Sequence, residues 1–330
     1  MSKFNKSIYL VFKGFAIGAA NIIPGVSGGT IALISGIYQE LLESIKSIDK
    51  VALSLLLNGK FNEFKTKINL SFFLSLGVGM ILSIFSIARL FDWLLRIYPI
   101  YIWAYFFGLI LASIVFVGKS VEKYTWREIS CLIIGTLVAT LISFSNPSLT
   151  PNENYFFIFF CGIIGISGML LPGLSGSYIL MLLGNYKLLM VDSINNLFEI
   201  IGLILAFDIS FIHNTEMMEK LIYFLLFLSG SIIGLLMFSH IISWIFNRYK
   251  NTTISILTGF VIGSLTIIWP WKNKITNPNI VDRLGEEIIV GYERYIPNTF
   301  DKSLFISLIC ILTGILCIWC TEKLTKHELK

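Results

Sequence analysis

Ile-Ile-Pro-Gly-Val-Ser-Gly-Gly-Thr, at residues 22–30, is the stretch on which the interpretation of this chain depends. A related stretch, Leu-Leu-Pro-Gly-Leu-Ser-Gly-Ser-Tyr, occurs at residues 170–178. Each copy places a helix-breaking Pro-Gly and small polar residues in the middle of a long apolar segment, where unpaired polar groups are costly. We therefore expect the two copies to face each other and to form one site.

The composition indicates an integral membrane protein. The chain has 330 residues, of which 55% are hydrophobic and 14% are charged, and its mean hydropathy is +0.80. An ordinary soluble domain carries about one quarter charged residues. The net charge of +5 is modest and is attributed to membrane topology, so we expect no nucleic-acid partner.

Two apolar segments, 8–44 and 155–190, are interrupted by the Pro-Gly pairs. Each half has roughly 16 residues, fewer than the ~20 that a spanning helix needs. We therefore predict two re-entrant helical hairpins that turn near the bilayer midplane. Uninterrupted apolar spans are expected at about 71–95, 99–118, 128–145, 221–246, 252–271 and 303–321. The segment 45–70 is expected to be an amphipathic surface loop, 191–220 a loop with room for a short interfacial helix, and 272–302 a charged loop.

The two halves of the sequence repeat each other. A shift of 148 positions superposes the hairpins through Gly14, Pro24, Gly25, Ser27, Gly28, Ile31, Gly36 and Tyr38. A shift of 151 positions superposes the following spans through Gly79, Trp93, Tyr98, Gly108 and Ser113. The sequence thus predicts an all-α integral membrane protein, with residues 1–330 forming a single polytopic membrane domain. Repeat one covers about 8–145 and repeat two about 155–321, and each contains a re-entrant hairpin plus three transmembrane helices.

Because three spans are an odd number, the second repeat is predicted to be inverted relative to the first. With the N-terminus inside, sixteen of the 25 Lys and Arg residues fall in inner segments and eight in outer segments. Cytoplasmic loops carry such an excess. We therefore expect a multi-pass protein of the cell membrane with cytoplasmic N- and C-termini.

The residues after each Pro-Gly are suited to bind an anion. Ser27 and Ser175 occupy N-cap positions, and Gly28, Gly29 and Gly176 would leave backbone N–H groups open at helix N-termini. The alternative is a glycine-rich packing contact between the hairpins. The candidate substrate-binding residues of the two copies are Asn21, Pro24, Gly25, Ser27, Gly28, Gly29, Thr30, Pro172, Gly173, Ser175, Gly176 and Ser177.

Two further candidates lie within spans. Intramembrane charge is costly, so Arg89 is either a ligand for the anion or an interfacial side chain paired with Asp92. The 151-residue shift relates Arg89 to His240, which is the second candidate. Glu40 and Glu43 are either interfacial or coupling carboxylates, which leaves a proton or cation as a coupling partner.

The same residues resemble a known family. Residues 18–30 with Gly36-Ile37-Tyr38, and residues 166–177 with Gly184-Asn185-Tyr186, are similar to the two signatures of the DUF368 family, over about residues 8 to 321. Members are assigned as polyprenyl-phosphate transporters that return undecaprenyl phosphate from the outer to the inner leaflet. The resemblance implies a polyprenyl phosphate lipid as substrate and no enzymatic activity.

Two other functions compete with this one. Undecaprenyl-pyrophosphate phosphatases also have re-entrant hairpins, but Gly28 and Gly176 stand where their motif has an arginine. A carrier for a small anionic solute or ion is the other alternative. The C-x-x-C at Cys317 and Cys320 lies in an apolar helix without a partner pair, so we expect no metal and no cofactor.

Overall fold

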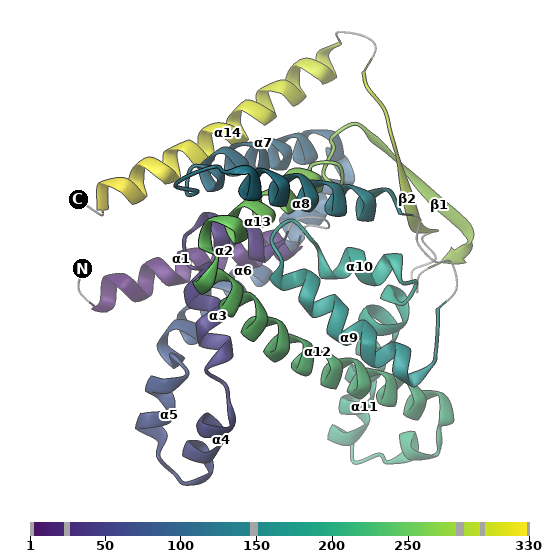
Figure 1. Ribbon diagram of the computed structural model, residues 1–330. Helices are drawn as coiled ribbons and strands as arrows, with labels where there is room; N and C mark the ends of the chain where they lie inside the picture. Colours follow the sequence, from purple (N-terminus) through teal and green to yellow (C-terminus); the bar gives the residue numbers. More distant parts are fainter. Residues whose placement is uncertain (1–2, 23–26, 146–150, 282–286, 298–300, 329–330) are drawn as a thin grey trace.

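The computed structural model is an assembly of helices with one two-stranded sheet (Figure 1). It describes residues 3–22, 27–145, 151–281, 287–297 and 301–328. The helices of the first half are α1 Lys3–Ile22, α2 Gly28–Ile34, α3 Tyr38–Lys46, α4 Lys50–Leu57, α5 Phe61–Lys67, α6 Leu70–Ile97, α7 Pro99–Gly118 and α8 Trp126–Phe144. Those of the second half are α9 Tyr155–Leu170, α10 Gly176–Leu182, η1 Lys187–Asp192, α11 Ser193–Leu205, η2 Ser210–His213, α12 Thr215–Arg248, α13 Lys250–Ser264 and α14 Lys302–Glu328.

Five helical segments are long and apolar enough to cross a membrane: α7, α8, the continuous η1–α11, α12 and the first 18 residues of α14. A sixth results if α5 and the start of α6, which meet at 67°, count as one bent span. Large apolar side chains such as Leu141 of α8, Ile232 of α12 and Leu312 of α14 are exposed along these helices, as expected for a surface that faces lipid. The predicted helical, multi-pass membrane architecture is therefore confirmed.

The predicted spans at 71–95, 99–118 and 128–145 coincide with α6, α7 and α8. Two expectations for the second half were wrong. The span expected at 252–271 is shorter, because α13 ends at Ser264. Residues 191–220 are mostly helical, since Ser193, Asn196 and Ile200 recur at helical spacing and are buried in α11.

The charged loop expected at 272–302 contains a β hairpin, so the fold is not purely helical. Strand β1 (Lys272–Val281) pairs antiparallel with β2 (Glu287–Arg294), and the register shifts twice along the ladder. Pairing with a second strand satisfies backbone groups that an extended loop would leave open. The Pro278 within β1 and the charged residues hide the alternating pattern that predicts a strand.

Glycines bring the helices into backbone contact at positions that the predicted repeat relates. A Cβ atom at Gly79 of α6 would lie 2.0 Å from the Val11 carbonyl oxygen of α1. The shift of 151 relates Gly79 to Gly230 of α12, where a Cβ atom would lie 2.1 Å from the Phe159 carbonyl oxygen of α9. Small residues permit such close approach of membrane helices. The α1–α6 and α9–α12 pairs therefore use the same kind of contact.

The remaining long helices pair across the two halves of the chain. A Cβ atom at Gly108 of α7 would lie 2.1 Å from the Ile311 carbonyl oxygen of α14. A Cβ atom at Gly259 of α13 would lie 2.3 Å from the Leu132 carbonyl oxygen of α8. Each half thus packs its last long helix against a helix of the other half. The inverted relation of the repeats stays a prediction.

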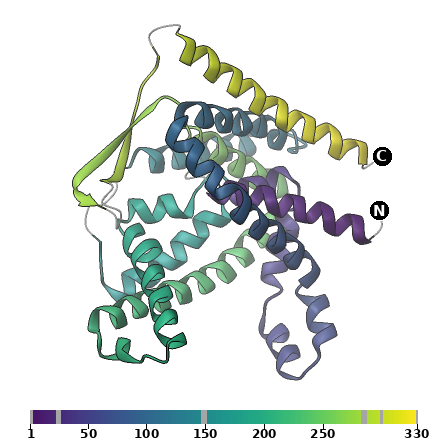
Figure 2. The same ribbon diagram turned by 180° about the vertical axis from the view of Figure 1, so that it is seen from behind.

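Both views place the start of α1 and the end of α14 on the same side of the molecule (Figures 1 and 2). The β hairpin lies on the opposite side in both views, and α4 and α5 project on the side of the termini. The cytoplasmic location of the termini also stays a prediction.

Replacing Gly79 with alanine should destabilise the protein, because the added Cβ atom would clash with backbone rather than with a flexible side chain. Overpacking of this kind costs about 1–3 kcal/mol. Gly77 of the same helix has nothing within 4 Å of the added atom, so Gly77→Ala serves as the matched control. Thermal unfolding in detergent measures both, and equal melting temperatures would contradict the close α1–α6 contact.

Candidate functional site

The two broken helices contact each other. The chain leaves α1 at Ile22 and enters α2 at Gly28, and it leaves α9 at Leu170 and enters α10 at Gly176. The hydroxyl oxygen of Ser27 lies 3.3 Å from the carbonyl oxygen of residue 169 and 3.5 Å from that of residue 171. The structure therefore brings the first Pro-Gly copy against the second, as the sequence predicts.

Two more hydrogen bonds join the copies. The backbone N–H of Gly173 donates to the Thr30 hydroxyl at 2.8 Å, and both groups are buried. The Tyr38 hydroxyl donates to the Leu170 carbonyl at 3.1 Å. An interrupted helix leaves backbone groups without hydrogen-bond partners, and each break obtains such partners from the other half of the chain.

The first break is closed by its own side chains. The N–H of Gly28 donates to Asn21 Oδ1 at 2.9 Å, and that of Gly29 donates to the Ser27 hydroxyl at 3.2 Å. The expectation that these two N–H groups stay open was therefore wrong. A Cβ atom at Gly29 would lie 2.8 Å from the Leu170 carbonyl oxygen, so this glycine allows close packing between the copies.

The second break is more open. Gly173 has a φ of +83°, and a Cβ atom there would lie 2.4 Å from the Phe260 carbonyl oxygen of α13, so only glycine fits. Ser175 occupies the N-cap position but bonds the Ser177 hydroxyl at 2.9 Å instead of capping the helix. Within the described residues, the N–H groups of Gly176, Ser177 and Tyr178 have no hydrogen-bond acceptor.

The structure places His240 and Glu40 away from this contact and does not describe the remaining predicted site residues in full. Pro24 and Gly25 lie outside the described residues, and so does the side chain of Arg89, whose backbone belongs to α6. His240 is exposed on α12, and its Nδ1 lies 2.8 Å from the Leu236 carbonyl oxygen of the same helix. Glu40 accepts a hydrogen bond from Asn69 at 3.2 Å, near the start of α6.

Sequence reasoning missed a group of residues next to the second break. The Tyr178 hydroxyl donates to the Ser143 carbonyl at 3.0 Å, at the end of α8. Arg294 Nη2 donates to the same carbonyl at 3.1 Å, and Arg294 Nε donates to the Thr266 carbonyl at 2.7 Å. The hairpin is therefore linked through Ser143 to the helix that follows the second break. Arg294 and Tyr178 lie far apart in the sequence, so no local sequence pattern connects them.

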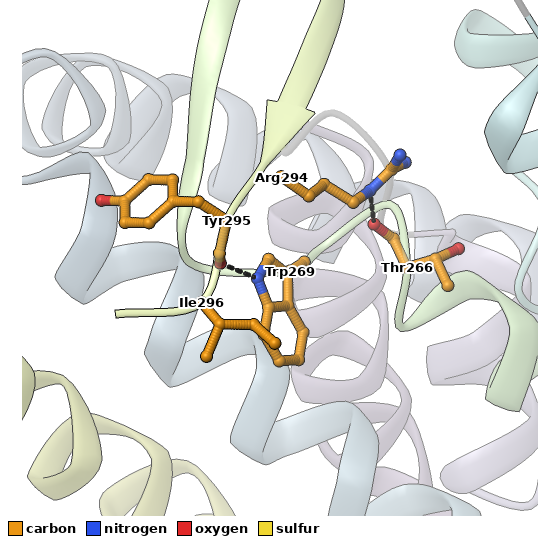
Figure 3. Close-up of a pocket in the computed structure, with 5 residues that line it drawn as sticks. All are labelled: Thr266, Trp269, Arg294, Tyr295 and Ile296. Atoms are coloured by element: carbon orange, nitrogen blue, oxygen red, sulfur yellow. Dashed lines mark hydrogen bonds between the residues drawn. The ribbon is translucent and has the colours of Figure 1, made fainter. Parts of the chain in front are cut away.

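A cavity of about 170 Å³ opens beside Arg294. Its lining consists of Thr266, Trp269, Arg294, Tyr295 and Ile296 (Figure 3). The Trp269 Nε1 donates to the Tyr295 carbonyl at 3.0 Å, which fixes the indole as one wall. The lining of the cavity is largely apolar, and the guanidinium group of Arg294 points away from Trp269 and Ile296 toward the Thr266 carbonyl. Among the described residues, no group of three or more His, Cys, Asp or Glu side chains could hold a metal ion.

These features define a polytopic helical membrane protein with two broken helices in contact. Residues 17–287 match the family described as "VCA0040-like: Undecaprenyl phosphate translocase-like", and the chain belongs to that family. It is 36% identical over 327 residues to a polyprenyl-phosphate transporter of Vibrio cholerae, with 96% of each chain covered. It is 28% identical over 275 residues to a polyprenyl-phosphate transporter of Staphylococcus aureus, covering 79% of this chain and 85% of that one. No solved structure matches the chain.

Replacing Thr30 with valine should destabilise the contact between the breaks, because the buried N–H of Gly173 would lose its acceptor. Leaving a buried donor unpaired costs about 1–3 kcal/mol. Thr30→Ser keeps the hydroxyl and is the matched control. Thermal unfolding in detergent compares the two, and equal stability of both variants with the wild type would show that this hydrogen bond contributes nothing.

Proposed function

We propose that this protein carries polyprenyl phosphate from the outer to the inner leaflet of the cell membrane, with the phosphate head passing the paired helix breaks. The observation that carries the proposal is the contact of the two breaks through Ser27, Thr30 and Gly173. Broken helices at membrane depth occur where they line a cavity or are buried in protein, and pairs of them mark the substrate site of many secondary transporters. The names of both relatives support the same substrate.

The arrangement of the helices supports two inverted repeats, each with a re-entrant hairpin. The first hairpin would comprise α1 to α3 and the second α9 to α10 with the start of η1. The related glycine contacts of α1–α6 and α9–α12 favour this division. With the termini on the cytoplasmic side, the β hairpin would face the outside.

The second break offers the better place for a phosphate. The N-terminal end of a helix carries partial positive charge, and its first N–H groups can bind anionic oxygens. In the first break, Asn21 and Ser27 already occupy two of these donors. We therefore assign the head group to the residues around Ser175, Gly176 and Ser177, with Ser27 and Thr30 holding the opposite wall.

The second break also lies near the lipid-facing surface. Met169, whose carbonyl oxygen the Ser27 hydroxyl contacts, is 40% exposed between the buried residues Gly168 and Leu170. A substrate with an apolar tail could therefore keep the tail in lipid while its head is at the break. This feature favours a lipid substrate over a small water-soluble anion, which would need a site sealed from lipid.

Transport can be tested with the purified protein in proteoliposomes that contain a fluorescent short-chain polyprenyl phosphate. The wild type should move the lipid between leaflets, measured as probe that becomes accessible to a membrane-impermeant quencher. Ser175→Leu should slow the transfer at least about tenfold, equivalent to about 1.4 kcal/mol in the barrier, because the side chain would fill the space beside Ser177. Ser130→Leu, on an exposed position of α8, should leave the rate within about twofold.

Two outcomes would contradict the proposal. The first is a wild-type protein that does not accelerate transfer over protein-free vesicles. The second is release of inorganic phosphate from the lipid at the rate of transfer, which would indicate a phosphatase. Repeating the assay with a proton or cation gradient of either direction identifies the coupling ion and the direction of net transport.

A further inference from the structure

Lys272 and Arg294 place two positive charges side by side on the β hairpin. They are directly opposite partners in the β1–β2 register. Like charges in opposed positions destabilise a pair of strands. Every ion pair among the described residues lies elsewhere in the chain, so neither cation has a carboxylate partner there.

Neutral groups surround both cations. Lys272 Nζ donates to the Ile267 carbonyl at 2.5 Å and lies 3.4 Å from the ring centroid of Trp103 and 4.6 Å from that of Tyr292. Arg294 uses Nε and Nη2 for its bonds to Thr266 and Ser143. Its Nη1, and two of the three Lys272 N–H groups, make no hydrogen bond within the described part of the chain.

The contacts offset only part of the charge. The carbonyl groups at the ends of α8 and α13 carry the negative ends of two helix dipoles, each equivalent to roughly half a charge. Two such ends compensate roughly one of the two positive charges. Burial, and secondarily the charge of Arg294, hold the pKa of Lys272 well below its usual range. The surroundings therefore favour a neutral Lys272 unless an anion is present.

Arg294 connects the second break to an apolar cavity, and Lys272 is its partner across the strand pair. Ser143 accepts hydrogen bonds from both Arg294 and Tyr178, which is the residue after Ser177 of the second Pro-Gly copy. On the other side, Arg294 shares the lining of the cavity with Trp269 and Ile296 (Figure 3). The guanidinium group points toward Thr266 and away from the apolar lining, so a ligand that contacts the cations and also enters the cavity would need an anionic head joined to hydrocarbon.

We propose that Lys272 and Arg294 form a receiving site for the phosphate monoester head of a polyprenyl phosphate, with its first hydrocarbon units against Trp269 and Ile296. This inference rests on the proposed function and adds a site that precedes the helix breaks. The hairpin lies on the side opposite the termini, where transport is proposed to start. Phosphate accepts charge-assisted hydrogen bonds from both side chains, which supply the charge that the helix breaks lack.

Binding to the full-length protein in detergent tests the site, with farnesyl phosphate, inorganic phosphate and farnesol as probes. Lys272→Gln and Arg294→Gln should each bind farnesyl phosphate at least about tenfold more weakly than the wild type, or about 1.4 kcal/mol. Lys272→Arg and Arg294→Lys keep the charge and should lose less than the glutamine variants. Lys220→Gln removes a cation paired with Glu216 and is the matched control, with unchanged affinity expected.

The outcomes separate this site from the proposed function. If the wild type binds and transfers the lipid but the glutamine variants bind equally well, only the receiving site is overturned. If the wild type neither binds nor transfers the lipid, the proposed function fails as well. Inorganic phosphate that binds as tightly as farnesyl phosphate would overturn a lipid site, and farnesol should bind weakly and equally to all variants.

The pH dependence of the wild type gives a readout that does not depend on a variant folding. Between pH 7.5 and 9.5 the phosphate stays dianionic, because its second pKa is about 6. Two other charged or titratable groups among the described residues face Lys272. Arg294 remains charged over this pH range, and Tyr292 remains neutral because burial raises its pKa. The affinity for farnesyl phosphate should therefore fall with rising pH as Lys272 loses its proton. A decline that persists unchanged in Lys272→Gln would overturn the assignment.

Discussion

The hydrogen bond from the Gly173 N–H to the Thr30 hydroxyl addresses the main physical difficulty of this fold. A helix that stops and restarts within an apolar region leaves backbone groups without partners, and each unpaired group costs several kcal/mol in hydrocarbon. Here the partners come from the other half of the chain. The Ser27 hydroxyl reaches two carbonyl groups of the second break, and Tyr38 reaches a third. Each break is thus stabilised by hydrogen bonds from the other copy, which add to those that Asn21 and Ser27 make within the first break.

The breaks can meet only because the surrounding helices approach closely. Glycines put the backbones of α1 and α6, and of α9 and α12, into direct contact, and α7–α14 and α8–α13 do the same across the two halves. Such contacts exclude even a methyl group, so the paired helices have little freedom to slide. They form a frame that holds the two breaks against each other, and the exposed apolar side chains on the outside of this frame face lipid.

The sequence predicts those parts of the structure that follow strong local rules. A Pro-Gly pair followed by small polar residues interrupts a helix, so the two breaks and their contact could be expected from residues 22–30 and 170–178 alone. The closing of the first break could not, because it depends on the direction in which Asn21 points. The hairpin was missed because Pro278 and its charges conceal the strand pattern. A count of Lys and Arg by segment treats all cations as equivalent. Only the folded chain shows that Lys272 and Arg294 have no carboxylate partner among the described residues.

The two copies differ most where their equivalent residues have diverged. The 148-residue shift relates Thr30 to Tyr178. Thr30 turns its hydroxyl inward and binds the other break, whereas the longer Tyr178 reaches outward to Ser143, which also holds Arg294. The β hairpin that carries Lys272 and Arg294 has no counterpart in the first half, where residues 119–125 connect α7 directly to α8. An inverted repeat with identical halves, as the sequence predicts, would offer an anion the same site from both sides of the membrane. This divergence places a cation next to the open helix start of the second break, whereas Asn21 and Ser27 bind two N–H groups of the first break. An anionic head arriving on the hairpin side would therefore meet the two cations before it reaches the breaks.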